Sequence, residues 1–118
     1  MDQTAADLLF VIREKLEDVV IELKNALDAA SDLVLRNELW HAWNDASGEL
    51  ARVNRAILDA GAGRLILAAP SDDLVQRTVA LADRVDGDLS AAQAVDAVVR
   101  LVNDLAGAFE AVAGHPAA

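Results

Sequence analysis

The chain has 118 residues, of which 54% are hydrophobic and only four are aromatic, and its formal charge is −10. This length suffices for one domain with a packed core and is too short for two. Because cysteine is absent, disulfides, thiolate metal sites and cysteine nucleophiles are excluded. The negative charge repels a phosphate backbone and the basic residues are scattered, so we expect no nucleic-acid binding.

The apolar residues are too dispersed for a membrane protein. Their longest uncharged run is far shorter than the roughly 20 residues that cross a bilayer. Residues 1–4 lack the basic region and the cleavage site of a secretory signal. We therefore expect a cytoplasmic protein that does not act at a membrane.

The first predicted helix begins near Thr4, because Thr4 and Asp7 have the spacing of a capping box. Seven apolar residues then recur at alternating steps of three and four, which places them on one helical face. These residues are Leu9, Ile12, Leu16, Val19, Leu23, Ala26 and Ala30. The phase breaks at Asn37, which predicts a turn over residues 30–32 and a cap from Ser31 or Asp32.

A second apolar stripe predicts a helix from about residue 35 to residue 60. Its members are Leu35, Leu39, Ala42, Ala46, Leu50, Val53, Ile57 and Ala60. The stripe keeps its phase through Gly48, so we expect one long helix although a helical glycine costs about 1 kcal/mol. Gly61 and Gly63 end this helix, and an apolar connector over residues 64–69 follows.

Two further helices complete the chain. Ser71 starts the third helix, which ends near Gly87, and a capping box over residues 90–93 starts the fourth, which ends at Gly114. Their core faces carry Leu74, Thr78, Leu81 and Val85, then Val95, Val98, Val102, Leu105, Phe109 and Val112. The prediction is one all-α domain over residues 1–118, a four-helix, mostly antiparallel up-and-down bundle with a short third helix.

The predicted core faces carry no carboxylate, which argues against a buried catalytic or metal site. Carboxylate-bridged metal sites in bundles need Glu-x-x-His on two inner faces, and the chain has this spacing once, at Glu38 and His41. A rotation of about 100° per residue places His41 on the outer face. No phosphate-binding glycine loop and no Ser/His/Asp arrangement is readable. We therefore expect no enzymatic activity, no metal and no cofactor.

The outer face of the second helix is the best candidate for a binding surface. The residues selected for it are Trp40, His41, Asn44, Gly48 and Arg52. Trp40 falls at the border between core and solvent, where tryptophan is enriched in binding hot spots. We interpret the chain as a small acidic adaptor or regulator that binds another protein of unknown identity.

An outward histidine on a long bundle helix, with a glycine further along, resembles a histidine phosphotransfer domain. Members of that family are four-helix bundles of about this length, and their histidine accepts phosphate from the aspartyl phosphate of a receiver domain. The resemblance covers His41 and the architecture. The family's lysine three residues after the histidine is Asn44 here, and the small residue after it is Asp45. Phosphotransfer at His41 is therefore the alternative function.

Two large apolar residues, Phe10 and Ile21, fall on the outer face of the first helix. A monomer has little reason to expose both, so we expect self-association, most simply as a two-fold dimer through this helix. A third hypothesis is a carrier of a small apolar ligand, since many Ala and Val side chains could leave a gap between helices.

Overall fold

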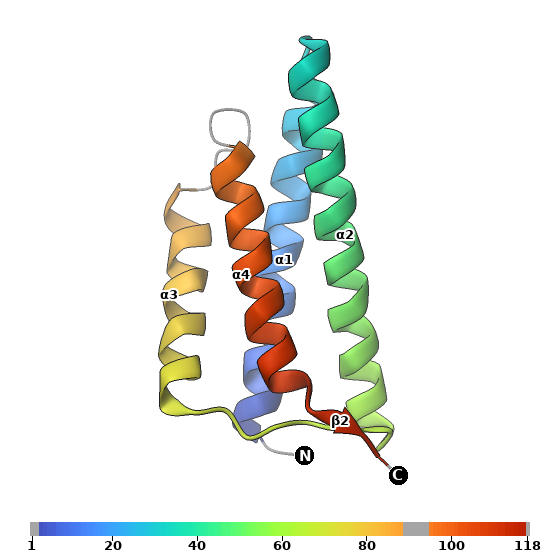
Figure 1. Cartoon of the computed structure of the whole chain (residues 1–118), viewed down its shortest axis with the longest axis vertical. Helices are drawn as coiled ribbons and strands as arrows, with labels where there is room; N and C mark the ends of the chain where they lie inside the picture. The colour runs from blue at the N-terminus through green and yellow to red at the C-terminus, as the bar shows by residue number, and fades with distance from the viewer. Residues whose placement is uncertain (1–2, 89–94, 118) are drawn as a thin grey trace.

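The protein is described here by a computed structural model, which covers residues 3–88 and 95–117. Its helices are α1 (Gln3–Ala29), α2 (Leu33–Gly61), α3 (Asp72–Asp88) and α4 (Val95–Ala113) (Figure 1). Two strands of two residues each, β1 (Leu65–Ile66) and β2 (His115–Pro116), pair antiparallel. The predicted all-α four-helix bundle is confirmed.

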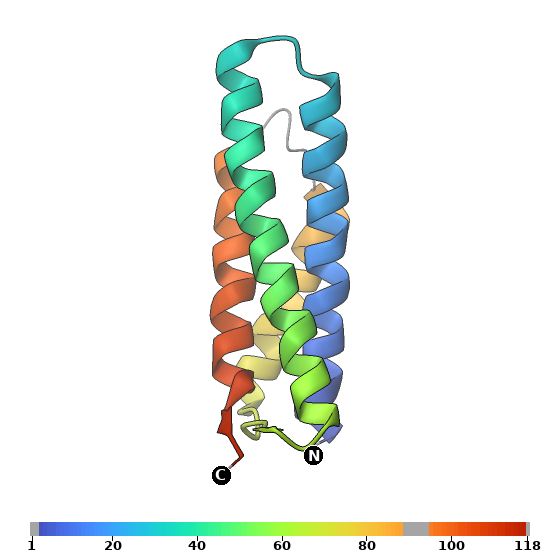
Figure 2. The same cartoon turned by 90° about the vertical axis from the view of Figure 1, so that its right-hand side faces the viewer.

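The chain reverses direction from each helix to the next (Figure 1 and Figure 2). The helix α1 contacts the other three, while α4 packs between α2 and α3, which lie on opposite sides of the bundle. The connection from α2 to α3 therefore crosses the end of the bundle. As a consequence α2 runs parallel to α4, and α1 runs parallel to α3, whereas the other packed pairs are antiparallel.

The four helices differ in length. The helices α1 and α2 have 27 and 29 residues, whereas α3 and α4 have 17 and 19. At 1.5 Å per residue the long pair extends about 40 Å and the short pair about 27 Å. The α1–α2 hairpin therefore projects past α3 and α4 at the end away from the termini (Figure 2).

The predicted stripes supply most of the core, which also includes Leu8, Leu27 and Leu101 outside the stripes. All members of the first stripe are buried except Ala30, which is partly exposed. In α2 the residues Leu35, Leu50 and Ile57 are only partly buried, although they pack against the core. The hydroxyl of Thr78 is buried and donates a hydrogen bond of 2.8 Å to the Leu74 carbonyl. This bond satisfies the one buried polar side chain among the described residues.

Two predicted caps are confirmed. The Asp32 carboxylate accepts a hydrogen bond of 3.0 Å from the Leu35 N–H at the start of α2. The Ser71 hydroxyl accepts one of 3.1 Å from the Leu74 N–H at the start of α3. Each bond satisfies an N–H group that has no partner within its helix, which is why these helices begin where the sequence indicates.

The first helix begins within one residue of the predicted Thr4, but the predicted capping role of Thr4 is wrong. The helix is already formed at Gln3, whose side-chain amide donates a hydrogen bond of 2.8 Å to Asp7. Thr4 therefore lies inside the first turn, where its hydroxyl is not in a capping position. The capping box predicted over residues 90–93 lies outside the described residues.

The end of the chain is tied to the α2–α3 connector. Leu65 is opposite Pro116 and Ile66 is opposite His115 in the small sheet. Two further backbone bonds flank it, from the Ala68 N–H to the Val112 carbonyl (3.0 Å) and from the Ala117 N–H to the Arg64 carbonyl (2.9 Å). The sheet was not predicted, since strands of two residues show no readable periodicity.

Gly114 makes the turn from α4 into β2, and its φ of 69° is in the left-handed region. A Cβ atom there would collide with the Ile66 carbonyl and lie 2.9 Å from the Ala68 nitrogen. We expect Gly114→Ala to lower the free energy of unfolding by about 2–3 kcal/mol, measured by urea denaturation. The matched control is Gly48→Ala, whose Cβ meets nothing within 4 Å and which should stabilise the helix by about 0.5–1 kcal/mol. Equal stability of the two variants would contradict this close backbone approach.

An ion-pair cluster joins α1 to the end of α3. The Lys15 Nζ lies 2.7 Å from the Asp86 carboxylate, 3.7 Å from that of Glu14 and 3.9 Å from that of Asp18. The hydrogen bond to Asp86 is the main cause that raises the pKa of Lys15 above its ordinary 10.5; burial opposes this, and the acidic charges add to it. Only 12% of the Lys15 side chain is exposed, so the cluster is partly shielded from solvent.

The raised pKa of Lys15 sets a pH dependence. Because the folded pKa lies above 10.5, the stabilisation is fully present below pH 10.5 and is lost as the pH rises through the folded pKa. We expect Lys15→Met to lower the free energy of unfolding by about 1 kcal/mol at pH 8. The difference between wild type and variant should shrink in denaturation curves recorded at higher pH. A constant difference up to pH 12 would show that Lys15 acts through packing rather than charge.

Candidate functional site

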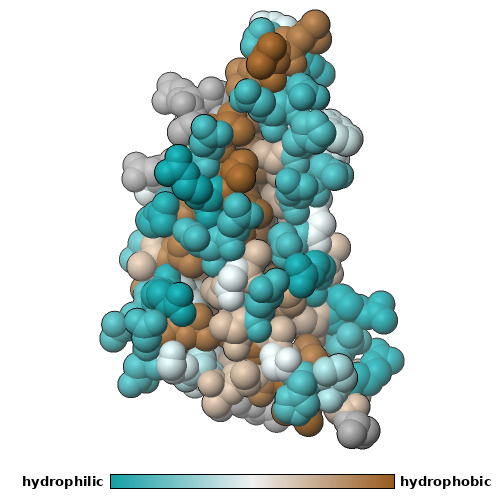
Figure 3. Space-filling model, in the orientation of Figure 1, coloured by the Kyte–Doolittle hydropathy of each residue, from teal (hydrophilic) through white to brown (hydrophobic). Residues whose placement is uncertain are grey.

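The large apolar side chains that remain exposed gather on the two long helices. Among the described residues, those on α1 and α2 are Phe10, Ile21, Leu33, Val34, Trp40 and Leu58, and the others are Ile66 and Val79. Apolar surface extends up to the projecting tip of the hairpin (Figure 3). Exposed apolar side chains of this kind are typical of surfaces that contact another molecule, and here they are concentrated on the long hairpin.

Trp40 and His41 lie together toward the projecting end of α2. Their rings meet edge to face, with centroids 5.1 Å apart and planes at 80°. His41 is exposed and Trp40 is half-exposed, as their predicted positions require. Trp43 turns toward α1 and is partly buried, with the Lys24 Nζ 5.8 Å from its ring centroid. The pair of Trp40 and His41 thus presents an aromatic surface and an accessible imidazole.

Asn44, Gly48 and Arg52 come together in a groove between α2 and α4. This part of the groove has a volume of about 400 Å³, and Asn103 lines it from α4. Further along, a recess of about 460 Å³ is lined by Arg52 and Arg55 from α2 and by Phe109 from α4. Since Arg52 lines both parts, we treat them as one feature, the α2–α4 groove.

Arg52 occupies the middle of the α2–α4 groove. Its guanidinium lies 3.0 Å from the Glu49 carboxylate and 3.7 Å from that of Glu110 on α4. Its central carbon is 5.6 Å from the ring centroid of Phe109, within the range of a cation–π contact. The side chain is nevertheless 55% exposed. The cation is therefore held in place over an apolar floor and remains accessible to a partner.

The α2–α4 groove has more acidic than basic groups. Asp45, Glu49, Asp59 and Glu110 lie in or beside it, whereas its basic groups are Arg52, Arg55 and Arg64. Asp59 also contacts Arg55 at 3.4 Å. The groove is open and shallow, so it suits a peptide segment or a helix rather than an enclosed small molecule.

The structure divides the predicted partner residues into two groups. Asn44, Gly48 and Arg52 line the α2–α4 groove, whereas Trp40 and His41 lie between it and the projecting tip. A Cβ on Gly48 would meet nothing within 4 Å, so no described part of this chain packs closely on that position. Phe109 and Glu110 were missed as site residues because helical periodicity does not tell which helix lies beside α2.

Phe10 and Ile21 are exposed, as predicted. The Arg13 guanidinium lies over the Phe10 ring, 5.0 Å from its centroid. A recess of about 140 Å³ beside Phe10 is lined by Ala6 and Leu9 from α1 and by Ile57, Ala60 and Gly61 from α2. The exposed Phe10 ring and the apolar recess thus lie side by side on the surface formed by α1 and α2.

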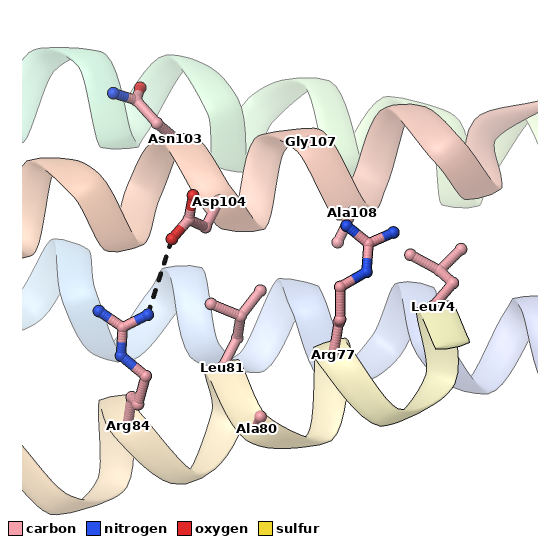
Figure 4. A pocket seen from close by; sticks show the side chains of 9 residues that line it. All are labelled: Leu74, Arg77, Ala80, Leu81, Arg84, Asn103, Asp104, Gly107 and Ala108. Atoms are coloured by element: carbon pink, nitrogen blue, oxygen red, sulfur yellow. Dashed lines mark ion pairs between the residues drawn. The ribbon is translucent and has the colours of Figure 1, made fainter. Parts of the chain in front are cut away.

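A third open recess, of about 480 Å³, lies between α3 and α4 (Figure 4). Arg77 and Arg84 line it, but each contacts an acidic side chain, Asp73 at 3.1 Å and Asp104 at 3.7 Å. The charges in this recess are therefore compensated within the chain, and the sequence did not single it out.

The described residues include no cluster of three or more acidic or histidine side chains that could hold a metal ion. None of the helices described is both long enough and apolar enough to cross a membrane. Comparison of the chain with protein-family models, curated proteins and solved structures gives no match.

Arg52→Ala tests whether Arg52 is a surface group rather than a structural one. Because its side chain is more than half exposed, we expect the variant to lower the free energy of unfolding by less than about 1 kcal/mol. Urea denaturation followed by circular dichroism measures this change. A loss above about 2 kcal/mol would assign Arg52 to the packing of α4 on α2.

Proposed function

We propose that the protein is a non-enzymatic interaction module, a small acidic adaptor or regulator of the cytoplasm that binds another protein along the α2–α4 groove. The observation that supports this most is the position of Arg52, held over Phe109 by contacts from both helices while half of it faces solvent. Ordered arginines beside aromatic rings are the kind of group that dominates protein interfaces.

The charges of the α2–α4 groove indicate the chemistry of the partner. The groove is net negative and the whole chain carries −10, so a partner segment with basic side chains is attracted to it. Arg52 offers such a segment one site for a carboxylate or a carbonyl oxygen. Gly48 lets a backbone approach α2 closely. His41 and Trp40 extend this surface toward the projecting tip.

Self-association through Phe10 and Ile21 is part of the same proposal. Both residues lie on α1, whereas the α2–α4 groove is lined by residues of α2 and α4. A dimer formed on α1 therefore leaves the groove open for a different protein.

Gly48→Arg tests the α2–α4 groove. A long side chain at this open helical position should leave the fold intact and block the groove, so we expect capture of the partner from native cell lysate to fall at least tenfold. The matched control is Gly107→Arg, on the α3–α4 recess, where a Cβ also meets nothing within 4 Å. Equal loss with both variants, or none with either, would argue against the groove as the binding surface.

Phosphotransfer at His41 is the second candidate, supported by the exposure of this side chain. Asp45, one helical turn away, places a negative charge near any phosphoryl group on the imidazole and disfavours it. Incubation with a phosphorylated receiver domain should give acid-labile phosphate that is lost in His41→Gln if this alternative holds. The apolar-carrier hypothesis is weaker, since the recess beside Phe10 holds about 140 Å³ and small-molecule sites need roughly 300 Å³ or more.

A further inference from the structure

One face of the α1–α2 hairpin is turned away from α3 and α4 (Figure 2). Four large apolar side chains mark this hairpin face. Phe10 and Ile21 of α1 are 45% and 59% exposed, and Trp40 and Leu58 of α2 are 47% and 67% exposed. The remaining helices cannot cover these residues, because they pack on the opposite side of the hairpin.

These four residues form a regular arrangement. Phe10 and Ile21 are eleven residues apart, which is three helical turns, so they point the same way about 16 Å apart. Trp40 and Leu58 are separated by five turns and likewise share a line, about 27 Å apart. Ile57 lines the recess beside Phe10, which places Leu58 near Phe10 at the end of the hairpin where the termini lie. Ile21 and Trp40 lie nearer the projecting tip.

We propose that a second copy of this chain docks on the hairpin face in antiparallel orientation, around a two-fold axis that crosses the hairpin near its middle. The α1 of one copy then packs on the α1 of the other copy, and the α2 of one copy packs on the α2 of the other. Phe10 meets the second copy's Ile21, and Leu58 meets the second copy's Trp40. This inference rests on the proposed self-association and specifies its geometry. A patch with apolar residues at both ends is self-complementary under such an axis.

The register sets which charged groups of the two α1 helices meet. Pairing residue 10 with residue 21 brings Arg13 level with the second copy's Asp18 and close to its Glu17. It also brings Glu14 level with the second copy's Glu17, which is a repulsive contact. The Arg13 side chain is 39% exposed and its ion pair with Glu17 in the same chain is long, at 3.8 Å, so its guanidinium can turn to the carboxylates of the second copy.

The size of the hairpin face matches the requirement of a stable dimer. Two helices about 40 Å long and about 10 Å apart present roughly 800 Å², which is the area that each partner buries in a standard protein interface. The α2–α4 groove stays accessible in this arrangement, so the dimer carries two grooves and can bind a repeated partner with increased avidity. Trp40 belongs to the dimer interface in this arrangement.

Sedimentation equilibrium at tens of micromolar tests the dimer. We expect a mass about twice the 12.5 kDa of the chain for the wild type, and the monomer mass for Ile21→Arg. The matched control is Val79→Arg, an exposed apolar residue on α3 that should leave the dimer unchanged. Circular dichroism confirms that each variant is folded. A monomeric wild type, or a dimer that Ile21→Arg does not weaken, overturns the proposal.

Disulfide trapping tests the register, because the chain has no cysteine of its own. Phe10→Cys mixed with Ile21→Cys should give a disulfide-linked heterodimer under mild oxidation, since these positions face each other across the axis. Neither variant should cross-link alone, because like positions are about 16 Å apart and a disulfide needs Cα atoms within about 7 Å. Cross-linking of each variant with itself overturns the antiparallel register. The lysate capture experiment with Gly48→Arg measures partner binding and does not depend on the dimer. A failure of the proposed dimer can therefore be distinguished from a failure of the proposed partner binding.

Discussion

The mutual burial of α1 and α2 is the interaction on which the rest of the structure depends. Ile12, Leu16 and Leu23 of α1 are completely buried, as are Leu39 and Val53 of α2. Each such side chain contributes about 1.5–3 kcal/mol when it leaves water, so the long hairpin supplies a large part of the stability. The short helices α3 and α4 add to it from one side. Because α3 and α4 pack on one side only, the hairpin forms the α2–α4 groove on that side and leaves the hairpin face uncovered on the other.

The same constraint explains why a surface rather than a cavity is proposed as the working part. The α2 core face relies on Ala42, Ala46, Ala56 and Ala60, whose small side chains let neighbouring helices approach closely. With four aromatic residues in the whole chain, little bulk is available to hold helices apart around an internal site. Among the described residues no ionisable side chain belongs to the buried core, and along the α2–α4 groove Arg52 contacts two carboxylates and the Phe109 ring.

The two proposed contacts use different faces of the bundle, although both include α2, and they depend on different physical interactions. The α2–α4 groove combines a fixed cation with several carboxylates, so binding there should depend on ionic strength. The hairpin face is held by apolar pairs with one charged contact at Arg13, so its association should be less sensitive to salt. A module built in this way can dimerise and bind a partner in the α2–α4 groove at the same time, because the dimer covers Trp40 but does not cover the groove.

The sequence by itself determined most of the residues that each helix buries and where most helices begin and end. Those features are local, since core stripes and caps such as Asp32 and Ser71 depend on residues three or four positions apart. It also placed Phe10 and Ile21 outside. Only the tertiary structure decided that the α2–α3 connection crosses the bundle and puts α4 beside α2. Periodicity shows which face of a helix is apolar and does not show what covers it. The contacts of Arg52 with Phe109 and of Gly114 with Ile66 were therefore beyond the reach of the sequence.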